Sequence, residues 1–155
     1  MNEKVTMQEL LPFIEEAFNN DKTFTIPITG TSMLPLLVQG RDTVTIKKVT
    51  AKLEVGDLPL YRRKDGAFVL HRIVKVNEDG TYTMCGDNQF LKEDGITDDD
   101  LIGVTTEIKR DGKSFSVDDS KYQRYVKKGL LFLNVRYPYK RLRYYLHIVK
   151  KKILK

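Results

Sequence analysis

Cysteines and long apolar runs are scarce in this sequence. The single cysteine, Cys85, excludes an internal disulfide framework and is compatible with a reducing compartment. No stretch reaches the roughly 18 to 20 consecutive apolar residues that a membrane-spanning helix needs. Acids occur within residues 1–16, where a signal peptide needs a cationic region and an apolar block. From these absences we expect a cytoplasmic protein with no signal peptide and no transmembrane helix.

Acidic residues are missing from the end of the chain. All 21 Asp and Glu lie within residues 1–119, beside 15 Lys and Arg, so this part carries a net charge of about −6. Residues 120–155 hold 12 Lys and Arg, no acid, and 6 of the 8 tyrosines. This division indicates a folded body followed by an interaction tail.

The chain begins with the pattern of one short helix. Thr6 and Glu9 have the spacing of a capping box, and the apolar residues that follow recur at helical intervals, which predicts a helix over 7–19. We therefore expect three parts: an N-terminal helix (1–22), a β domain (23–118) and a basic, Tyr-rich C-terminal segment (119–155).

Most of the remaining chain has the pattern of short β-strands. The segments are rich in β-branched residues, and turn signals at 64–66, 78–80 and 111–112 separate several of them. A parallel sheet would need helices between its strands, and none is evident. The predicted fold is mainly β, a coiled antiparallel sheet or partly open β-barrel. Its predicted strands are 24–29, 42–49, 58–63, 67–76, 81–85, 101–110 and 113–117.

Two segments depart from the strand pattern. Residues 92–100 are acidic, and we expect them to form a surface loop. The tail has a more helical pattern, and we expect Gly129 and Pro138 to break it into pieces.

Ser32 lies in the segment Gly-Thr-Ser-Met-Leu-Pro at 30–35. A nucleophilic serine needs an exposed hydroxyl on a sharp turn, so that a backbone N–H faces the developing oxyanion. Glycine two residues before the serine and proline three residues after it favour such a turn. Alone, this spacing is more typical of a structural turn.

Two other segments carry chemically useful side chains. His71 is one of only two histidines and falls inside a strand pattern. The sequence Gly-Asp-Asn at 86–88 follows another predicted strand and has the character of a tight turn. Each of these, taken singly, is more often structural than catalytic.

Taken in order, the segments resemble the signal peptidase I superfamily. The resemblance covers about residues 28–105 and implies a catalytic β domain that hydrolyses peptide bonds in leader or precursor peptides. In it Ser32 is the nucleophile and His71 the general base. The matching boxes are Gly-x-Ser-Met-x-Pro at 30–35, Gly-Asp at 56–57, base-Arg-Ile at 71–73 and Gly-Asp-Asn at 86–88.

The base is the distinctive position. Most bacterial signal peptidases and the related self-cleaving repressors carry lysine there, whereas His71 resembles the branch of the endoplasmic-reticulum complex, archaea and some spore-forming bacteria. A histidine base titrates near neutral pH without much tuning, but a carboxylate that orients the ring helps it. Asp87 is the preferred carboxylate, and Glu93 and Asp94 are the alternatives.

The resemblance also implies how the transition state is held. The backbone N–H of Ser32 is the expected oxyanion donor, with Thr31 and Met33 beside it as oxyanion or substrate-binding residues. No metal and no cofactor are expected.

Strand alternation assigns a different role to the residue after the histidine. Arg72 points to the opposite face from His71 on a regular strand, so we expect it to form a structural ion pair, with Asp87 or Asp57.

The basic tail, 120–155, leaves three interpretations open. Its Leu and Tyr side chains pack on the acidic body, or they lie in the boundary of an anionic membrane with cations against the headgroups. The third is contact with nucleic acid or an acidic partner, although nothing resembles a base-reading motif.

The leading function, a serine peptidase, has a peptide or precursor protein as its partner. The alternative is a non-enzymatic protein that binds a membrane surface or nucleic acid through the tail.

Overall fold

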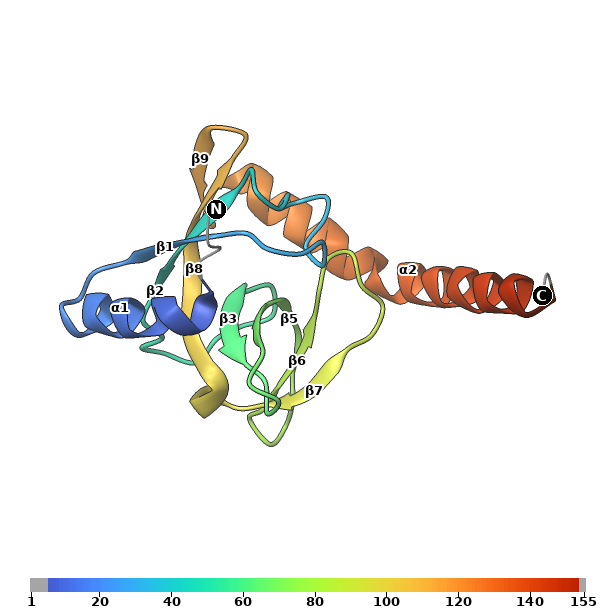
Figure 1. Cartoon of the computed structure of the whole chain (residues 1–155), viewed down its shortest axis with the longest axis horizontal. Helices are drawn as coiled ribbons and strands as arrows, with labels where there is room; N and C mark the ends of the chain where they lie inside the picture. The colour runs from blue at the N-terminus through green and yellow to red at the C-terminus, as the bar shows by residue number, and fades with distance from the viewer. Residues whose placement is uncertain (1–5, 154–155) are drawn as a thin grey trace.

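The computed structural model describes residues 6–153 and is mainly β (Figure 1). The side chains of 134–137, 140–141, 147–148 and 151–153 lie outside the description. In chain order the elements are α1 (Met7–Asn19), β1 (Phe24–Pro27), β2 (Thr43–Lys47), β3 (Pro59–Arg62), β4 (Phe68–Leu70), β5 (Arg72–Val76), β6 (Tyr82–Cys85), β7 (Glu93–Ile96), the 3-10 turn η1 (Asp98–Asp100), β8 (Leu101–Arg110), β9 (Lys113–Ser116) and α2 (Ser120–Ile153).

The predicted helix at the start of the chain is confirmed as α1. The Thr6 N–H donates to a carboxylate oxygen of Glu9 at 2.7 Å, and the Glu9 N–H donates back to the Thr6 hydroxyl at 3.4 Å. This reciprocal pair satisfies N–H groups that the first turn leaves without helical partners. Ile14 and Phe18 are buried, so the helix packs its apolar face on the strands.

Two curled antiparallel sheets form a half-barrel, which confirms the predicted fold class. The larger sheet has the order β1-β2-β8-β3-β4, with β9 also on β8, and the smaller has the order β5-β6-β7. Register shifts at Thr45/Ile46 and Leu60/Tyr61 mark irregularities of the kind that increase local twist and bending. The three predicted turns connect β3 to β4, β5 to β6 and β8 to β9.

Three local predictions are corrected. The predicted strand 67–76 is interrupted at His71, which lies between β4 and β5. Part of the expected surface loop 92–100 is strand β7, because its backbone pairs with β6 without needing apolar side chains. The helix α2 continues through Gly129 and Pro138, since a 34-residue helix retains its other backbone hydrogen bonds when proline removes one.

The base of α2 belongs to the same core as the strands. Tyr122 and Val126 are buried in one cluster with Ile14 of α1 and Leu60 of β3. Beyond this contact the C-terminal half of α2 extends past the strands (Figure 1). Over the part of the chain that the structure describes, no helix is both long and apolar enough to cross a membrane.

Candidate active site

The loop between β1 and β2 carries Ser32. Gly30 begins its turn with φ +77°, a left-handed conformation that favours glycine, and its N–H donates to the side-chain oxygen of Gln39 at 2.8 Å. Ser32 itself is half-buried. In the described hydrogen bonds its N–H donates to no protein acceptor, so this N–H remains available as an oxyanion donor.

Ser32 and His71 line one cavity of about 240 Å³. His71 is only 2% exposed, whereas Ser32 reaches the cavity from its loop. The two side chains are not hydrogen-bonded to each other in this structure; such bonds are often long before a substrate binds. Apolar lining side chains include Ile26, Ile28, Met33, Leu60, Phe68 and Leu70.

The turn after β6 brings the serine loop and the histidine together. A Cβ on Gly86 would lie 2.7 Å from the Ser32 carbonyl oxygen and 3.1 Å from His71 Nε2, so only glycine allows this approach. The next residues attach the loop: the Asn88 N–H donates to the Ser32 carbonyl oxygen at 2.7 Å, and its side-chain amide donates to the Thr31 carbonyl oxygen at 3.2 Å. Nε2 and the Ser32 carbonyl oxygen therefore both lie against Gly86.

Asp87 pairs with Arg72 rather than with the histidine. Two hydrogen bonds of 2.8 Å join the guanidinium to the carboxylate, and both side chains are almost fully buried. Arg72 also donates to the Tyr122 hydroxyl at 3.1 Å, and the Tyr125 hydroxyl donates to Asp87 at 3.0 Å. The predicted ion pair of Arg72 thus forms, and two tyrosines attach the base of α2 to it.

Glu93 is the carboxylate that reaches His71. One carboxylate oxygen lies 3.2 Å from Nδ1, and the other accepts from the Tyr61 hydroxyl at 2.9 Å and from Arg63 Nε at 2.6 Å. The contacts of Asp87 do not match the expectation that it orients the ring, and Glu93, named as an alternative, occupies that position.

The remaining sequence-predicted residues are divided between the cavity and the surface. Met33 is buried in the cavity wall, and its sulfur accepts from the Asp87 N–H at 3.5 Å. Thr31 is exposed and contributes only its carbonyl oxygen to the clamp by Asn88. Asp94 is exposed and accepts from the Thr83 hydroxyl at 2.7 Å, on the other side of β7 from the histidine.

The contacts of Glu93 determine which nitrogen of His71 carries the proton. Burial works to raise the pKa of Glu93, but hydrogen bonds from Arg63 and Tyr61 outweigh it and hold this pKa below its ordinary value. An ionised carboxylate only accepts, and the Tyr61 hydroxyl, 3.3 Å from Nδ1, donates to Glu93, so the tautomer that fits both contacts carries its hydrogen on Nδ1. Nε2 then keeps its lone pair, on the side of the ring next to Gly86.

The protonation of His71 favours its use as a base. Burial lowers its pKa below the ordinary value of 6.5, although the charge of Glu93 opposes this. At neutral pH the ring is therefore the neutral imidazole, which is the form that accepts a proton. Burial, and then the charge of Glu93, also raise the pKa of Tyr61, so its hydroxyl stays protonated and donates.

Sequence reasoning missed Tyr61 and Arg63, which both contact Glu93. A signal was present, because the two residues alternate along the strand pattern and so share one face. The sequence did not reveal that both residues would contact Glu93.

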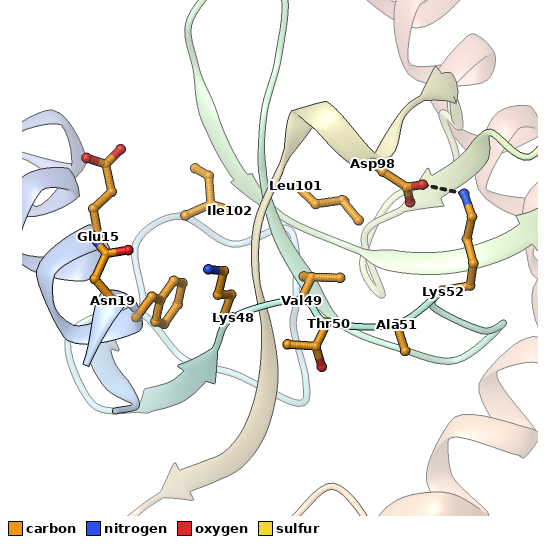
Figure 2. Close-up of a pocket in the computed structure, with 11 residues that line it drawn as sticks. Glu15, Asn19, Lys48, Val49, Thr50, Ala51, Lys52, Asp98, Leu101 and Ile102 are labelled. Carbon is orange, nitrogen blue, oxygen red and sulfur yellow. Dashed lines mark hydrogen bonds and ion pairs between the residues drawn. The ribbon is translucent and has the colours of Figure 1, made fainter. Parts of the chain in front are cut away.

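A larger cavity of about 600 Å³ lies between α1 and the segment after β2 (Figure 2). Its lining includes Lys48, Lys52 and Asp98, and the Lys52 ammonium is already paired with Asp98. It contains no serine, cysteine or histidine that could act as a nucleophile and base together. No cluster of metal-binding side chains is found among the described residues.

Comparisons with known proteins give no independent assignment. No family model, curated protein or solved structure matches the chain. A function can therefore be inferred only from the geometry of the site and the order of the sequence motifs.

Proposed function

We propose that the protein is a serine endopeptidase of the signal-peptidase type, with Ser32 as nucleophile and His71 as general base. The observation that carries the proposal is the shared cavity, together with Gly86, against which Nε2 of a buried neutral histidine and the serine loop both lie. Glu93 supports the role of His71 because its carboxylate lies 3.2 Å from Nδ1 and favours the hydrogen there, which leaves Nε2 as the proton acceptor.

The reaction follows from these positions. Ser32 Oγ attacks the carbonyl carbon of the scissile bond while its proton passes to His71 Nε2, and the oxyanion accepts from the Ser32 N–H. The C–N bond then breaks, His71 returns the proton to the leaving amine, and an acyl-enzyme remains. Water repeats the attack with His71 as base, which releases the acid and restores the serine. Glu93 stabilises the imidazolium in both steps.

The cavity suits an extended peptide. Residues of β1 and β4 line it, and these strands stand at the two ends of the order of the larger sheet. A sheet edge binds a peptide through backbone hydrogen bonds, while alternate side chains enter pockets. The small apolar volume between the edges favours small side chains next to the cut.

The test is digestion of a mixed peptide library rich in alanine-containing leader sequences, followed by mass spectrometry. We expect cleavage by the native chain and its loss in both Ser32→Ala and His71→Ala. Ser114→Ala is the matched control, because this serine is exposed on β9, away from the cavity. Cleavage that persists in Ser32→Ala would overturn the proposal, as would a native chain that leaves the whole library intact.

A further inference from the structure

The inner face of α2 is held by the body. Tyr122, Val126 and Leu133 recur at helical intervals and are all buried. Farther along the helix, the ring of Tyr144 lies 5.5 Å from that of Phe90, on the loop before β7. Since Tyr144 follows Leu133 by eleven residues, about three turns, it continues the same face. One side of α2 therefore packs against the body of the protein.

A second apolar stripe lies on the opposite side of α2, and we call it the outer stripe. Leu131 is 76% exposed although Leu133, two residues on, is buried, because a step of two residues turns a helix by about 200°. The other members follow Leu131 at helical spacing and are about half exposed. The outer stripe consists of Leu131, Leu142, Leu146 and Val149.

Cations surround the outer stripe. Arg124 and Lys128 precede Leu131 by seven and three residues and so lie on the same side of the helix, and both are exposed. Arg143 and Lys150 are exposed beside the stripe in its second half. No acid occurs anywhere in residues 120–155 to neutralise them.

From this arrangement we infer that the outer stripe of α2 binds the headgroup boundary of an anionic lipid bilayer. A bilayer surface offers apolar chains and negative charge together, which is the combination that the stripe and its cations complement. A second copy of α2 would cover the leucines but bring two sets of 12 cations together. Nucleic acid would neutralise the cations but leave the leucines in water.

The course of α2 makes this surface accessible. Its C-terminal half extends past the strands (Figure 1). Its base is attached to the body by hydrogen bonds of Tyr122 with Arg72 and of Tyr125 with Asp87. A helix that lies on a membrane would therefore hold the body at a defined distance and orientation. The inference does not depend on whether Ser32 is a nucleophile.

The experiment is co-sedimentation of the full chain with vesicles of phosphatidylcholine, with and without phosphatidylglycerol. We expect binding to the anionic vesicles that weakens as salt is added. The double variant Leu142→Gln/Leu146→Gln should bind at least tenfold more weakly, because two apolar contacts are lost. Phe13→Gln is the matched control, since Phe13 is 59% exposed but lies on α1.

A second variant tests the electrostatic half of the inference. Arg143→Gln/Lys150→Gln should weaken binding to anionic vesicles by roughly tenfold or more and leave any binding to phosphatidylcholine unchanged. All measurements are repeated on Ser32→Ala, so that a failure of the peptidase proposal does not affect them.

Five results would overturn the inference. These are an absence of binding to anionic vesicles, equal binding to both lipids, and equal loss in the Phe13→Gln control. The fourth is a dimer in sedimentation velocity that the leucine variant abolishes, which would identify a second copy as the occupant. The fifth is duplex DNA binding that the leucine variant leaves intact, without vesicle binding, which would identify nucleic acid as the occupant.

Discussion

Two carboxylates lie near the histidine, and each pairs with an arginine and accepts from a tyrosine hydroxyl. Glu93 is bound by Arg63 and Tyr61, and its side chain is 23% exposed. Asp87 is bound by Arg72, and its side chain is 10% exposed. Only Glu93 touches the imidazole, although Asp87 is the one in the sequence motif.

Glu93 orients the imidazole ring, whereas Asp87 holds segments of the backbone together. Asp87 neutralises a buried guanidinium next to His71 in sequence, and with it attaches α2 to the body. Glu93 lines a neighbouring pocket with Arg63, and its charge acts on the ring from the Nδ1 side without being deeply buried. The pair of Asp87 and Arg72 therefore stabilises the fold, whereas the pair of Glu93 and Arg63 controls the protonation of His71.

The largest expected effect is on the buried pair. Asp87→Ala leaves the Arg72 charge buried without its carboxylate, and we expect the free energy of unfolding to fall by about 3–5 kcal/mol. Urea denaturation monitored by circular dichroism measures this. In the exposed control, Asp94→Ala, the loss should be about 1 kcal/mol or less. Equal losses in the two variants would contradict the role given to Asp87.

The next effect concerns activity. Glu93→Gln should lower kcat/KM on a cleaved peptide on the order of a hundredfold, because the imidazolium loses its carboxylate while the fold is largely kept. Denaturation should show a loss of only about 1 kcal/mol, as for a partly exposed ion pair. A variant with native kcat/KM would remove Glu93 from the proposed mechanism.

A smaller effect should appear in the pH dependence. Burial lowers the pKa of His71, so the acid limb of kcat/KM should lie below pH 6.5. In Glu93→Gln it should move to still lower pH, since the charge that favours the imidazolium is gone. Folding stability should change with pH in the same direction. The unfolded chain binds a proton at His71 more readily than the folded chain does, so the free energy of unfolding should decrease as the pH falls below about 6.5. An acid limb above 6.5 would contradict the assignment.

The smallest effect is expected for the hydroxyl that Glu93 shares with the ring. Tyr61→Phe removes a hydrogen bond to Glu93 and a long one of 3.3 Å to His71 Nδ1, but the carboxylate keeps Arg63 and His71, so kcat/KM should fall only about fivefold, or about 1 kcal/mol. Steady-state kinetics on the same peptide measures the change. A loss as large as that of Glu93→Gln would mean that the two residues act as one unit.

The parts of the fold that could be predicted depend on local interactions. The capping box at Thr6 and Glu9 and the glycine turns act within a few residues, so the sequence reveals them directly. The strand β7 could not be found this way, because an acidic segment joins β6 through its backbone alone. The unbroken course of α2 depends likewise on the whole helix, and not on the residues around Gly129 and Pro138.

The site divides in the same way. The order of the motifs predicts that Ser32, His71 and the turn at 86–88 belong to one site, and in the structure the first two line one cavity. The choice among carboxylates depends on the register of β7 on β6, which has an irregularity between Tyr82 and Met84. A change of one residue in register reverses which side chains face the histidine, and sequence spacing does not specify it.

Gly86 has a consequence for how this sequence can diverge. A Cβ there would lie 2.7 Å from the Ser32 carbonyl oxygen, and that oxygen is fixed by the Asn88 N–H, so a substitution has no room to be accommodated. Exposed positions such as Asp94 are open to drift without disturbing the cavity. In a relative too distant for overall similarity to be measurable, we expect glycine at this position to persist after most of the surface has changed.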